Sequence, residues 1–204
     1  MSAKTILKQI PGLQHLYGVL INYYNKRLYE KNPKLLANES YKRTYKHDID
    51  WENPKDLNEK IIWMQFNTDT RLWSRLADKY LVRDYVCEKG EEKLLNKLYG
   101  RYNSADEIDF DSLPNQFVLK PNNASGKVIL VKDKSELDVK KTRKILNKWL
   151  KSTFVYNNAE LHYARIEPCL IAEEYLEEIG KTRLIDYKFY CFNGIPESIE
   201  VVTY

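Results

Sequence analysis

The chain has 204 residues, of which 43% are hydrophobic and 30% are charged, a balance typical of soluble globular proteins. Its 33 basic and 29 acidic residues leave a net charge of +4, too mild to favour nucleic-acid binding, which usually shows a clustered basic face. The three cysteines show no metal-binding or disulfide spacing, which fits a reducing cytosol. The seven glycines form neither GxGxxG nor GxxxxGKS/T, so a classical dinucleotide-binding fold and a P-loop are both disfavoured.

Residues 1–90 form a predicted helical region. Apolar periodicity indicates helices over residues 13–30 and 34–46, joined at Asn32-Pro33. Two further helices are indicated by apolar stripes, one at Leu57, Ile61 and Met64 and one at Leu72, Trp73, Leu76, Ala77 and Tyr80. The apolar-leaning stretch 13–24 is shorter than a membrane-spanning helix requires. We therefore expect it to pack against its own domain, and we expect the region to end near Gly90.

After residue 94 the pattern changes to strands and one helix. Residues 94–102 and 169–177 are predicted strands, and FVLKPNNASGKVILV (117–131) is a predicted hairpin with a polar loop. Ser135 to Asp138 matches a capping box for a helix that runs to about residue 151. Residues 184–192 and 195–203 form a second predicted hairpin around Asn193-Gly194, a type I′ turn signal. The order indicates an α+β protein with regions 1–90, 91–182 and 183–204.

The loop of the 117–131 hairpin is the strongest pointer to a ligand. Lys120 ends the first strand, and the loop adds backbone N–H groups together with Ser125, Gly126 and Lys127. Oriented amides beside an ammonium group suit a polyphosphate. The alternative is a lysine that simply leaves a strand into solvent.

An acidic pair follows the apolar run Leu170 to Ala172. Because successive side chains of a strand alternate, Glu173 and Glu174 must face opposite sides, so one of them is pressed toward whatever the sheet covers. The pair is either an exposed strand edge or a hinge, where backbone groups meet a purine and a carboxylate takes a ribose hydroxyl.

Other polar residues give weaker signals. Asp186 and Lys188 share one face of a predicted strand, either as a salt pair or as a phosphate or substrate contact. The histidines at positions 15, 47 and 162 have no partner at metal-ligand spacing, and we expect surface or packing roles for them. No Ser/His/Asp or Cys/His catalytic set is visible.

Together these segments resemble the TupA-like ATP-grasp family, which is associated with teichuronopeptide and other surface-polysaccharide biosynthesis. The resembling stretches are LADKYLVRDYV (76–86), FVLKPNNASGKVILVKDKS (117–135), LIAEEYLE (170–177) and DYKFYCFNG (186–194). They occur in the family's order between about residues 56 and 202.

The resemblance implies a mobile lid, made of antiparallel strands and a helix, that closes over ATP against a second core. Lys120 would reach the α- and β-phosphates of ATP, bound as its Mg²⁺ complex. Ser125, Gly126 and Lys127 would belong to the loop over the triphosphate.

The same resemblance implies an adenine site at the hinge. Glu174, Tyr175 and Leu176 would line it, with backbone contacts from Glu174 and Leu176. Glu173 or Glu177 would accept a hydrogen bond from the ribose or from an amine. The implied role of Lys188 is a further contact to phosphate or to the hinge.

The activity implied by the resemblance is ATP-dependent carboxylate–amine ligation through an acyl phosphate, with a polysaccharide or an amino acid as acceptor. The sequence offers no candidate for the acidic and Asn ligands that hold Mg²⁺ in a second core. We therefore expect a catalytic core cut short at Tyr204, no metal site, and an inactive chain in isolation.

Two alternatives stay open. One is a non-catalytic module or glycosyltransferase-associated protein of the same pathway. The other is glycosyl transfer at Asp109-x-Asp111 or Asp48-x-Asp50. We expect a cytoplasmic protein without a transmembrane segment, and contact with the inner membrane face stays open.

Overall fold

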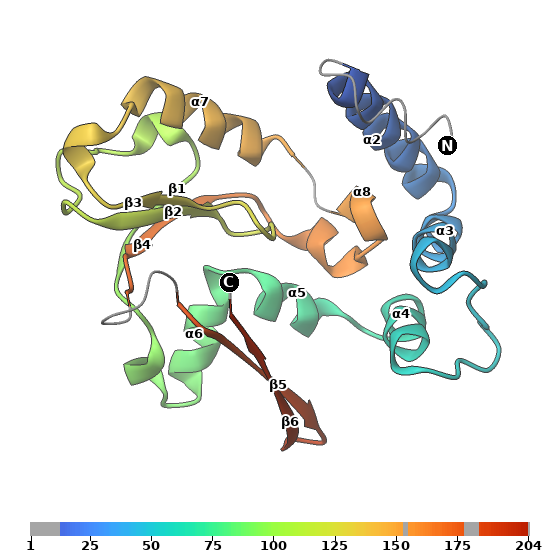
Figure 1. The fold of residues 1–204 in the computed structure, drawn as a ribbon. Coiled ribbons are helices and arrows are strands. Elements are labelled where there is room, and N and C mark those ends of the chain that lie inside the picture. The colour runs from blue at the N-terminus through green and yellow to red at the C-terminus, as the bar shows by residue number, and fades with distance from the viewer. Residues whose placement is uncertain (1–12, 153–154, 178–183, 204) are drawn as a thin grey trace.

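The computed structural model describes residues 13–152, 155–177 and 184–203. Helices from the N-terminal part lie beside a four-stranded antiparallel sheet, and a separate two-stranded hairpin extends near the C-terminus (Figure 1). This arrangement confirms the predicted α+β class. Across the described ranges, no helix is both long enough and apolar enough to cross a bilayer.

The helical part contains α2 (Leu13–Lys31), α3 (Pro33–Tyr45), α4 (Leu57–Asn67), α5 (Arg71–Ala77) and α6 (Leu81–Glu88). The break between α2 and α3 follows from local chemistry. The Asn32 side chain accepts a hydrogen bond from the N–H of Leu35, and Pro33 occupies the first turn of α3. Asp56 caps α4 in the same way. A small core of Leu36, Ala37 and Ala159 links α3 to α4, with Trp51, Ile62 and Phe66 packed around it.

The apolar stripe predicted for α4 is not the side of the helix that faces the core. Leu57, Ile61 and Met64 are each at least 40% exposed, whereas Ile62 and Phe66 face the core. Glu59 explains the difference, because its carboxylate is buried and accepts the backbone N–H groups of Asp50 and Lys55. A satisfied buried carboxylate fixes which side of the helix turns inward.

The predicted helix around residues 72–80 is broken in two. α5 ends at Ala77, and the buried Asp78 has an extended conformation, with ψ 111°. Its carboxylate accepts the N–H groups of Tyr80 and Leu81, which begins α6. The helix stop expected at Glu88-Lys89-Gly90 is confirmed, since α6 ends at Glu88 and Gly90 has φ +73°.

The main sheet contains β1 (Leu98–Tyr102), β2 (Phe117–Pro121), β3 (Ile129–Val131) and β4 (Leu170–Glu174) in the order β1-β4-β2-β3. All three pairings are antiparallel. The predicted 117–131 hairpin is confirmed. The strands predicted over residues 94–102 and 169–177 are shorter than expected, and Leu94 lies in a 3₁₀ helix, η1 (Glu92–Leu94).

Helix α7 (Val139–Leu150) covers one face of this sheet (Figure 1). The core between them contains Phe117 and Leu119 of β2, Leu170 and Ala172 of β4, and Leu146 of α7. The N-terminus of α7 differs from the prediction, because its cap is Asp138. Ser135 instead belongs to the short η3 (Lys134–Glu136) and hydrogen-bonds to Asp133.

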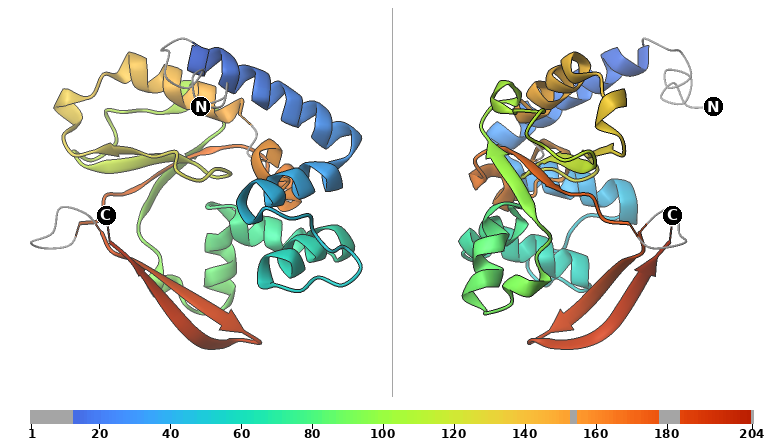
Figure 2. Two further views of the ribbon diagram at one scale, coloured as in Figure 1. Left: turned by 45° about the vertical axis from the view of Figure 1, so that its right-hand side comes forward. Right: turned by 90° about the vertical axis from the view of Figure 1, so that its left-hand side faces the viewer.

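Two further segments complete the chain. α8 (Val155–Asn158) and the 3₁₀ helix η4 (Leu161–Arg165) lie against the N-terminal helices (Figure 2). β5 (Asp186–Phe192) and β6 (Ile195–Val202) form a hairpin apart from the main sheet. Its type I′ turn is confirmed by positive φ at both Asn193 (52°) and Gly194 (80°). The boundaries at residues 90 and 182 stay predictions.

Candidate functional site

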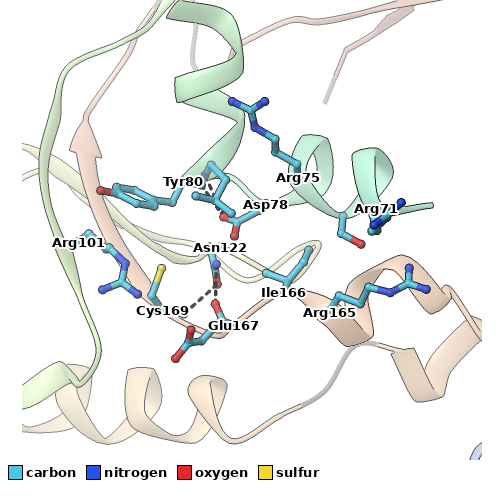
Figure 3. A pocket seen from close by; sticks show the side chains of 12 residues that line it. Arg71, Arg75, Asp78, Tyr80, Arg101, Asn122, Arg165, Ile166, Glu167 and Cys169 are labelled. Carbon is cyan, nitrogen blue, oxygen red and sulfur yellow. Dashed lines mark hydrogen bonds between the residues drawn. The ribbon is translucent and has the colours of Figure 1, made fainter. Parts of the chain in front are cut away.

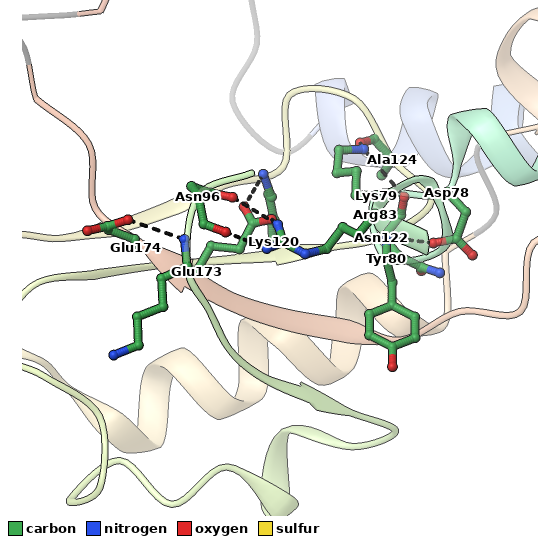
Figure 4. Close-up of polar contacts among 11 residues, drawn as sticks. Asp78, Lys79, Tyr80, Arg83, Asn96, Lys120, Asn122, Ala124, Glu173 and Glu174 are labelled. Carbon is green, nitrogen blue, oxygen red and sulfur yellow. Dashed lines mark hydrogen bonds and ion pairs between the residues drawn. The ribbon is translucent and has the colours of Figure 1, made fainter. Parts of the chain in front are cut away.

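A cluster of charged side chains lies on the sheet face opposite α7. Because strand residues alternate, Lys120 of β2 and Glu173 of β4 share this face, and the Lys120 ammonium pairs with Glu173 Oε2. Arg83 of α6 approaches the other carboxylate oxygen, with Nη1 3.5 Å from Oε1. The Glu173 side chain is only 6% exposed, whereas that of Lys120 is 26% exposed. The Glu173 carboxylate is therefore buried between two cations, while the Lys120 side chain is partly exposed (Figure 4).

Arg83 is held in place by the segment before β1. Its Nη1 donates to Asn96 Oδ1 over 2.9 Å, and its Nη2 donates to the backbone carbonyl of Asn96. Such forked contacts fix a planar guanidinium in one orientation. The position of Arg83 beside Glu173 is consequently set by the fold around α6.

Lys79 adds a second ammonium group near the hairpin loop. Its backbone N–H donates to Asn122 O over 3.1 Å, and its Nζ donates to Ala124 O over 2.6 Å (Figure 4). Burial, followed by repulsion from Lys120, lowers the pKa of Lys79. Lys120 and Arg83 thus pair with Glu173, and Lys79 adds a third cation close enough to Lys120 to be repelled by it.

The hairpin loop is pinned at its beginning and exposed at its tip. Asn122, Asn123 and Ala124 are buried, so this half of the loop is less open to a ligand than the tip. The amide of Asn122 bridges Glu167 O and Cys169 N, each over 2.9 Å, because the loop packs against the segment that leads into β4. Ser125 and Gly126 are exposed, and Gly126 has φ +70°.

Lys127 and Lys188 have other partners. Lys127 donates to Ser152 Oγ next to the end of α7, and burial lowers its pKa. Lys188 lies on β5, where its Nζ is 3.4 Å from Glu200 Oε2, and Tyr190 donates to the same carboxylate. Lys188 thus pairs with Glu200 across the hairpin, whereas the sequence suggested Asp186 as its partner.

The predicted hinge residues follow directly after Glu173. Glu174 accepts the N–H of Lys97 through its carboxylate and donates its own N–H to Lys97 O, so it ties β4 to the segment before β1. Tyr175 is half-buried, while Leu176 and Glu177 are exposed. The opposite facing of Glu173 and Glu174 predicted from strand alternation is confirmed.

A cavity of about 670 Å³ lies beside the cluster (Figure 3). It is lined by α5, the start of α6, β1 and the segment before β4, and it includes four arginines, Arg71, Arg75, Arg101 and Arg165. Sequence reasoning missed this pocket, and it also missed Arg83 and Lys79 in the cluster. For the pocket, the sequence offered the i, i+4 spacing of Arg71 and Arg75, which places both arginines on one face of a helix.

The residues considered for metal binding are engaged elsewhere. Asp109 accepts the N–H of Asp111, and Asp48 pairs with Lys42 over 2.8 Å. His162 packs against Trp73, and burial lowers its pKa. The side chain of His15 lies outside the described residues. Within the described ranges, no three His, Cys, Asp or Glu side chains group as a metal site would require.

The resemblance to ATP-grasp proteins predicted antiparallel strands, a helix and a phosphate-binding lysine, and the sheet, α7 and Lys120 have this arrangement. The family model for the TupA-like ATP-grasp proteins matches residues 59–203, a span that includes the sheet, the cluster and the final hairpin. The chain belongs to this family. Neither a curated protein nor a solved structure matches the chain significantly.

Proposed function

We propose that this chain binds ATP on the sheet face opposite α7, with Lys120 as the principal phosphate contact. The observation that carries the proposal is the cluster itself, in which Lys120 and Arg83 flank the Glu173 carboxylate and Lys79, bonded to Ala124 O, adds a third cation near Lys120. Such an excess of fixed positive charge favours a polyanion, and ammonium and guanidinium groups make strong charge-assisted hydrogen bonds to phosphate.

Within this proposal the other cluster residues position Lys120. Glu173 lies diagonally across β2 and β4 from Lys120 and holds its long side chain toward the cluster. Arg83 and Asn96 support Glu173 from α6 and the segment before β1. A triphosphate would then meet an ammonium that is already oriented, which reduces the entropy lost on binding.

The loop and the hinge supply the rest of the proposed site. Ser125 and Gly126 form an exposed tip whose positive φ lets backbone amides approach a phosphate closely. Residues 174–177 offer backbone groups and the exposed Leu176 side chain to adenine, and Glu173 or Glu177 accepts from the ribose. Lys127 and Lys188 reach phosphate only by leaving Ser152 and Glu200.

We propose ATP-dependent carboxylate–amine ligation in surface-polysaccharide synthesis as the parent activity, with a polysaccharide or an amino acid as acceptor, and we expect this chain in isolation to bind ATP without turning it over. MgATP, when bound, supplies the phosphoryl group that activates the carboxylate as an acyl phosphate. The residues described here bind and orient that triphosphate. Because ATP is a cytoplasmic metabolite, the proposal places the site of action in the cytoplasm.

The test is a calorimetric titration with a non-hydrolysable ATP analogue, with and without Mg²⁺. We expect saturable binding that weakens at least about tenfold in Lys120→Met, because a hydrogen bond to a charged group contributes about 1.5–3 kcal/mol. Methionine keeps most of the lysine stem and limits the loss of packing. Lys132→Met, at an exposed lysine just after β3, is the matched control.

Equal affinity of the two variants for the analogue would contradict the proposal. Circular dichroism must first show that both variants are folded at the titration temperature, with the helix content of the unaltered chain. A folded chain that does not bind the analogue at all would also overturn it.

A further inference from the structure

The cavity next to the cluster has a basic rim and a buried floor. Its floor contains Asp78, Asn122, Ile166 and Cys169, which are all less than 7% exposed. The four arginines form the more exposed rim (Figure 3). They come from three separate segments, with two on α5, one on β1 and one on η4. The tertiary fold, rather than one basic stretch of sequence, assembles this ring of guanidinium groups.

Two of the rim arginines have spare hydrogen-bonding capacity. Arg101 donates to Asn103 Oδ1 over 2.8 Å, and Arg165 donates to Thr70 Oγ1 over 2.7 Å. Within the described part of the chain, neither makes an ion pair with a carboxylate. A guanidinium carries five N–H donors, so most donors of both residues remain available to a ligand.

The other two rim arginines are partly neutralised. Arg71 pairs with Asp69 and Arg75 with Glu88, each over 2.6 Å. These carboxylates do not line the cavity. Arg71 and Arg75 therefore add little net positive charge to the rim, and Arg101 and Arg165 are its principal candidates for anion contact.

Two polar side chains of the floor are held by backbone groups. Asp78 accepts hydrogen bonds from two backbone N–H groups at the start of α6. The side-chain amide of Asn122 donates to Glu167 O and accepts from Cys169 N. Among the described residues, Asp78 forms no ion pair with Arg101 or Arg165, the two rim arginines that lack a carboxylate partner. The second carboxylate among the lining residues is Glu167, which is exposed.

We propose that this arginine-rimmed pocket binds a small anionic molecule that carries at least two carboxylate or phosphate groups. A volume of about 670 Å³ lies within the usual range of ligand sites. Arg101 and Arg165 lie on opposite sides of the floor (Figure 3), so two anionic groups at the ends of one ligand fit better than one. Guanidinium groups recognise both carboxylate and phosphate by paired hydrogen bonds.

The pocket is separate from the proposed ATP contacts. Lys120, Glu173 and Arg83 do not line it, whereas Asn122 lines the pocket and also accepts the backbone N–H of Lys79 through its carbonyl. The inference therefore stands whether or not Lys120 binds ATP. Its test uses anions that contain no nucleotide.

The probes are citrate, a tricarboxylate, and pyrophosphate, each titrated into the full chain by calorimetry at low salt. We expect saturable binding of at least one probe and an affinity at least about tenfold lower in the double variant Arg101→Gln/Arg165→Gln. The control Arg43→Gln/Lys132→Gln removes the same charge at exposed positions outside the pocket, and we expect it to leave the affinity nearly unchanged. The tighter probe identifies a carboxylate or a phosphate ligand.

Three outcomes would overturn the proposal: no binding of either probe, equal weakening by the control, or binding that Lys120→Met abolishes and the arginine variant retains. If Arg101→Gln/Arg165→Gln does not fold, the proposal is tested on the unaltered chain by NMR. In the unaltered chain, the Nε–Hε NMR signals of Arg101 and Arg165 are expected to shift with the same dissociation constant as the calorimetric titration. Unmoved signals at saturating probe would likewise overturn it.

Discussion

Lys120 and Glu173 form their ion pair diagonally across β2 and β4. In the register of these strands Lys120 lies opposite Ile171, and Glu173 lies opposite Val118. Diagonal neighbours on one face are within reach of long side chains, so the pair depends on both the register and the alternation of the two strands. A slip of one residue would turn Lys120 toward α7 and into the apolar core.

Replacing Glu173 should cost far more stability than replacing its neighbour. Glu173→Gln leaves Lys120 and Arg83 without their buried counter-charge, and breaking a buried ion pair is strongly destabilising. Because Lys120 is 26% exposed, we expect a loss of about 2 kcal/mol in the free energy of unfolding at neutral pH. Glu174→Gln, on the opposite face, should cost about 0.5 kcal/mol or less. Urea unfolding compares the two, and similar losses would refute this account of the cluster.

Asn122 and Asn123 offer a second matched comparison. Asn122→Ala removes the amide that bridges Glu167 O and Cys169 N, and unsatisfied buried groups cost about 1–3 kcal/mol each. The Oδ1 atom of Asn123 is buried without a partner among the described residues, so Asn123→Ala should cost clearly less. Thermal melts of both variants provide the measurement, and a larger loss in Asn123→Ala would contradict the bridging role of Asn122.

The three cysteines should react with thiol reagents at very different rates. Cys87 and Cys191 are exposed, whereas Cys169 is buried at the start of β4. Burial raises the pKa of the Cys169 thiol to about 11, so near pH 8 it lacks the thiolate that reacts. Under native conditions we expect two fast equivalents of thiol labelling and a third only after denaturant is added. Mass spectrometry of the peptides identifies the sites, and fast native labelling of Cys169 would contradict its burial.

Acid should destabilise the helical part through Asp56 and Glu59. The backbone N–H of Glu59, and then the Tyr41 hydroxyl, hold the pKa of Asp56 below its ordinary value of 3.8. The backbone N–H groups of Lys55 and Asp50 hold the pKa of Glu59 below 4.5. Since both folded pKa values are lowered, the unfolded chain takes up protons first, and the stabilisation present at neutral pH is lost as the pH falls below these ordinary values.

The variant Glu59→Gln provides the check on this pH dependence. It should lower the stability measured at pH 7 and flatten the loss of stability between about pH 5 and pH 3. The control is Glu52→Gln, an exposed carboxylate before α4, which should leave the profile unchanged. Identical pH profiles for Glu59→Gln and the unaltered chain would contradict the role of the Glu59 carboxylate.

Local rules predicted the parts of this structure that depend on neighbouring residues. Strand alternation predicted that Glu173 and Glu174 face opposite sides of the sheet, and the Asn193-Gly194 pair predicted the type I′ turn. Both predictions follow from backbone geometry alone. Lys120 was likewise placed correctly at the end of a hairpin strand. Its partner Glu173, by contrast, lies 53 positions further on and could be matched to it only through the sheet register.

Features set by long-range contacts were not accessible from the sequence. Arg83 meets Glu173 through tertiary packing, and Arg101 and Arg165 share a pocket only because β1 and η4 lie near α5. The buried face of α4 was mistaken for a related reason. Apolar periodicity cannot show that Glu59 is drawn inward by backbone N–H groups that precede the helix.

The strand order also has a consequence for how the chain folds. β4 is the last strand of the main sheet in sequence, yet it lies between β1 and β2. During synthesis β1 therefore has no hydrogen-bonded neighbour in this sheet until residues 170–174 leave the ribosome, about 70 positions later. Pairings so distant in sequence close slowly because of the loop entropy they cost. The face that carries Lys120 is thus completed late, after the β2–β3 hairpin can already exist.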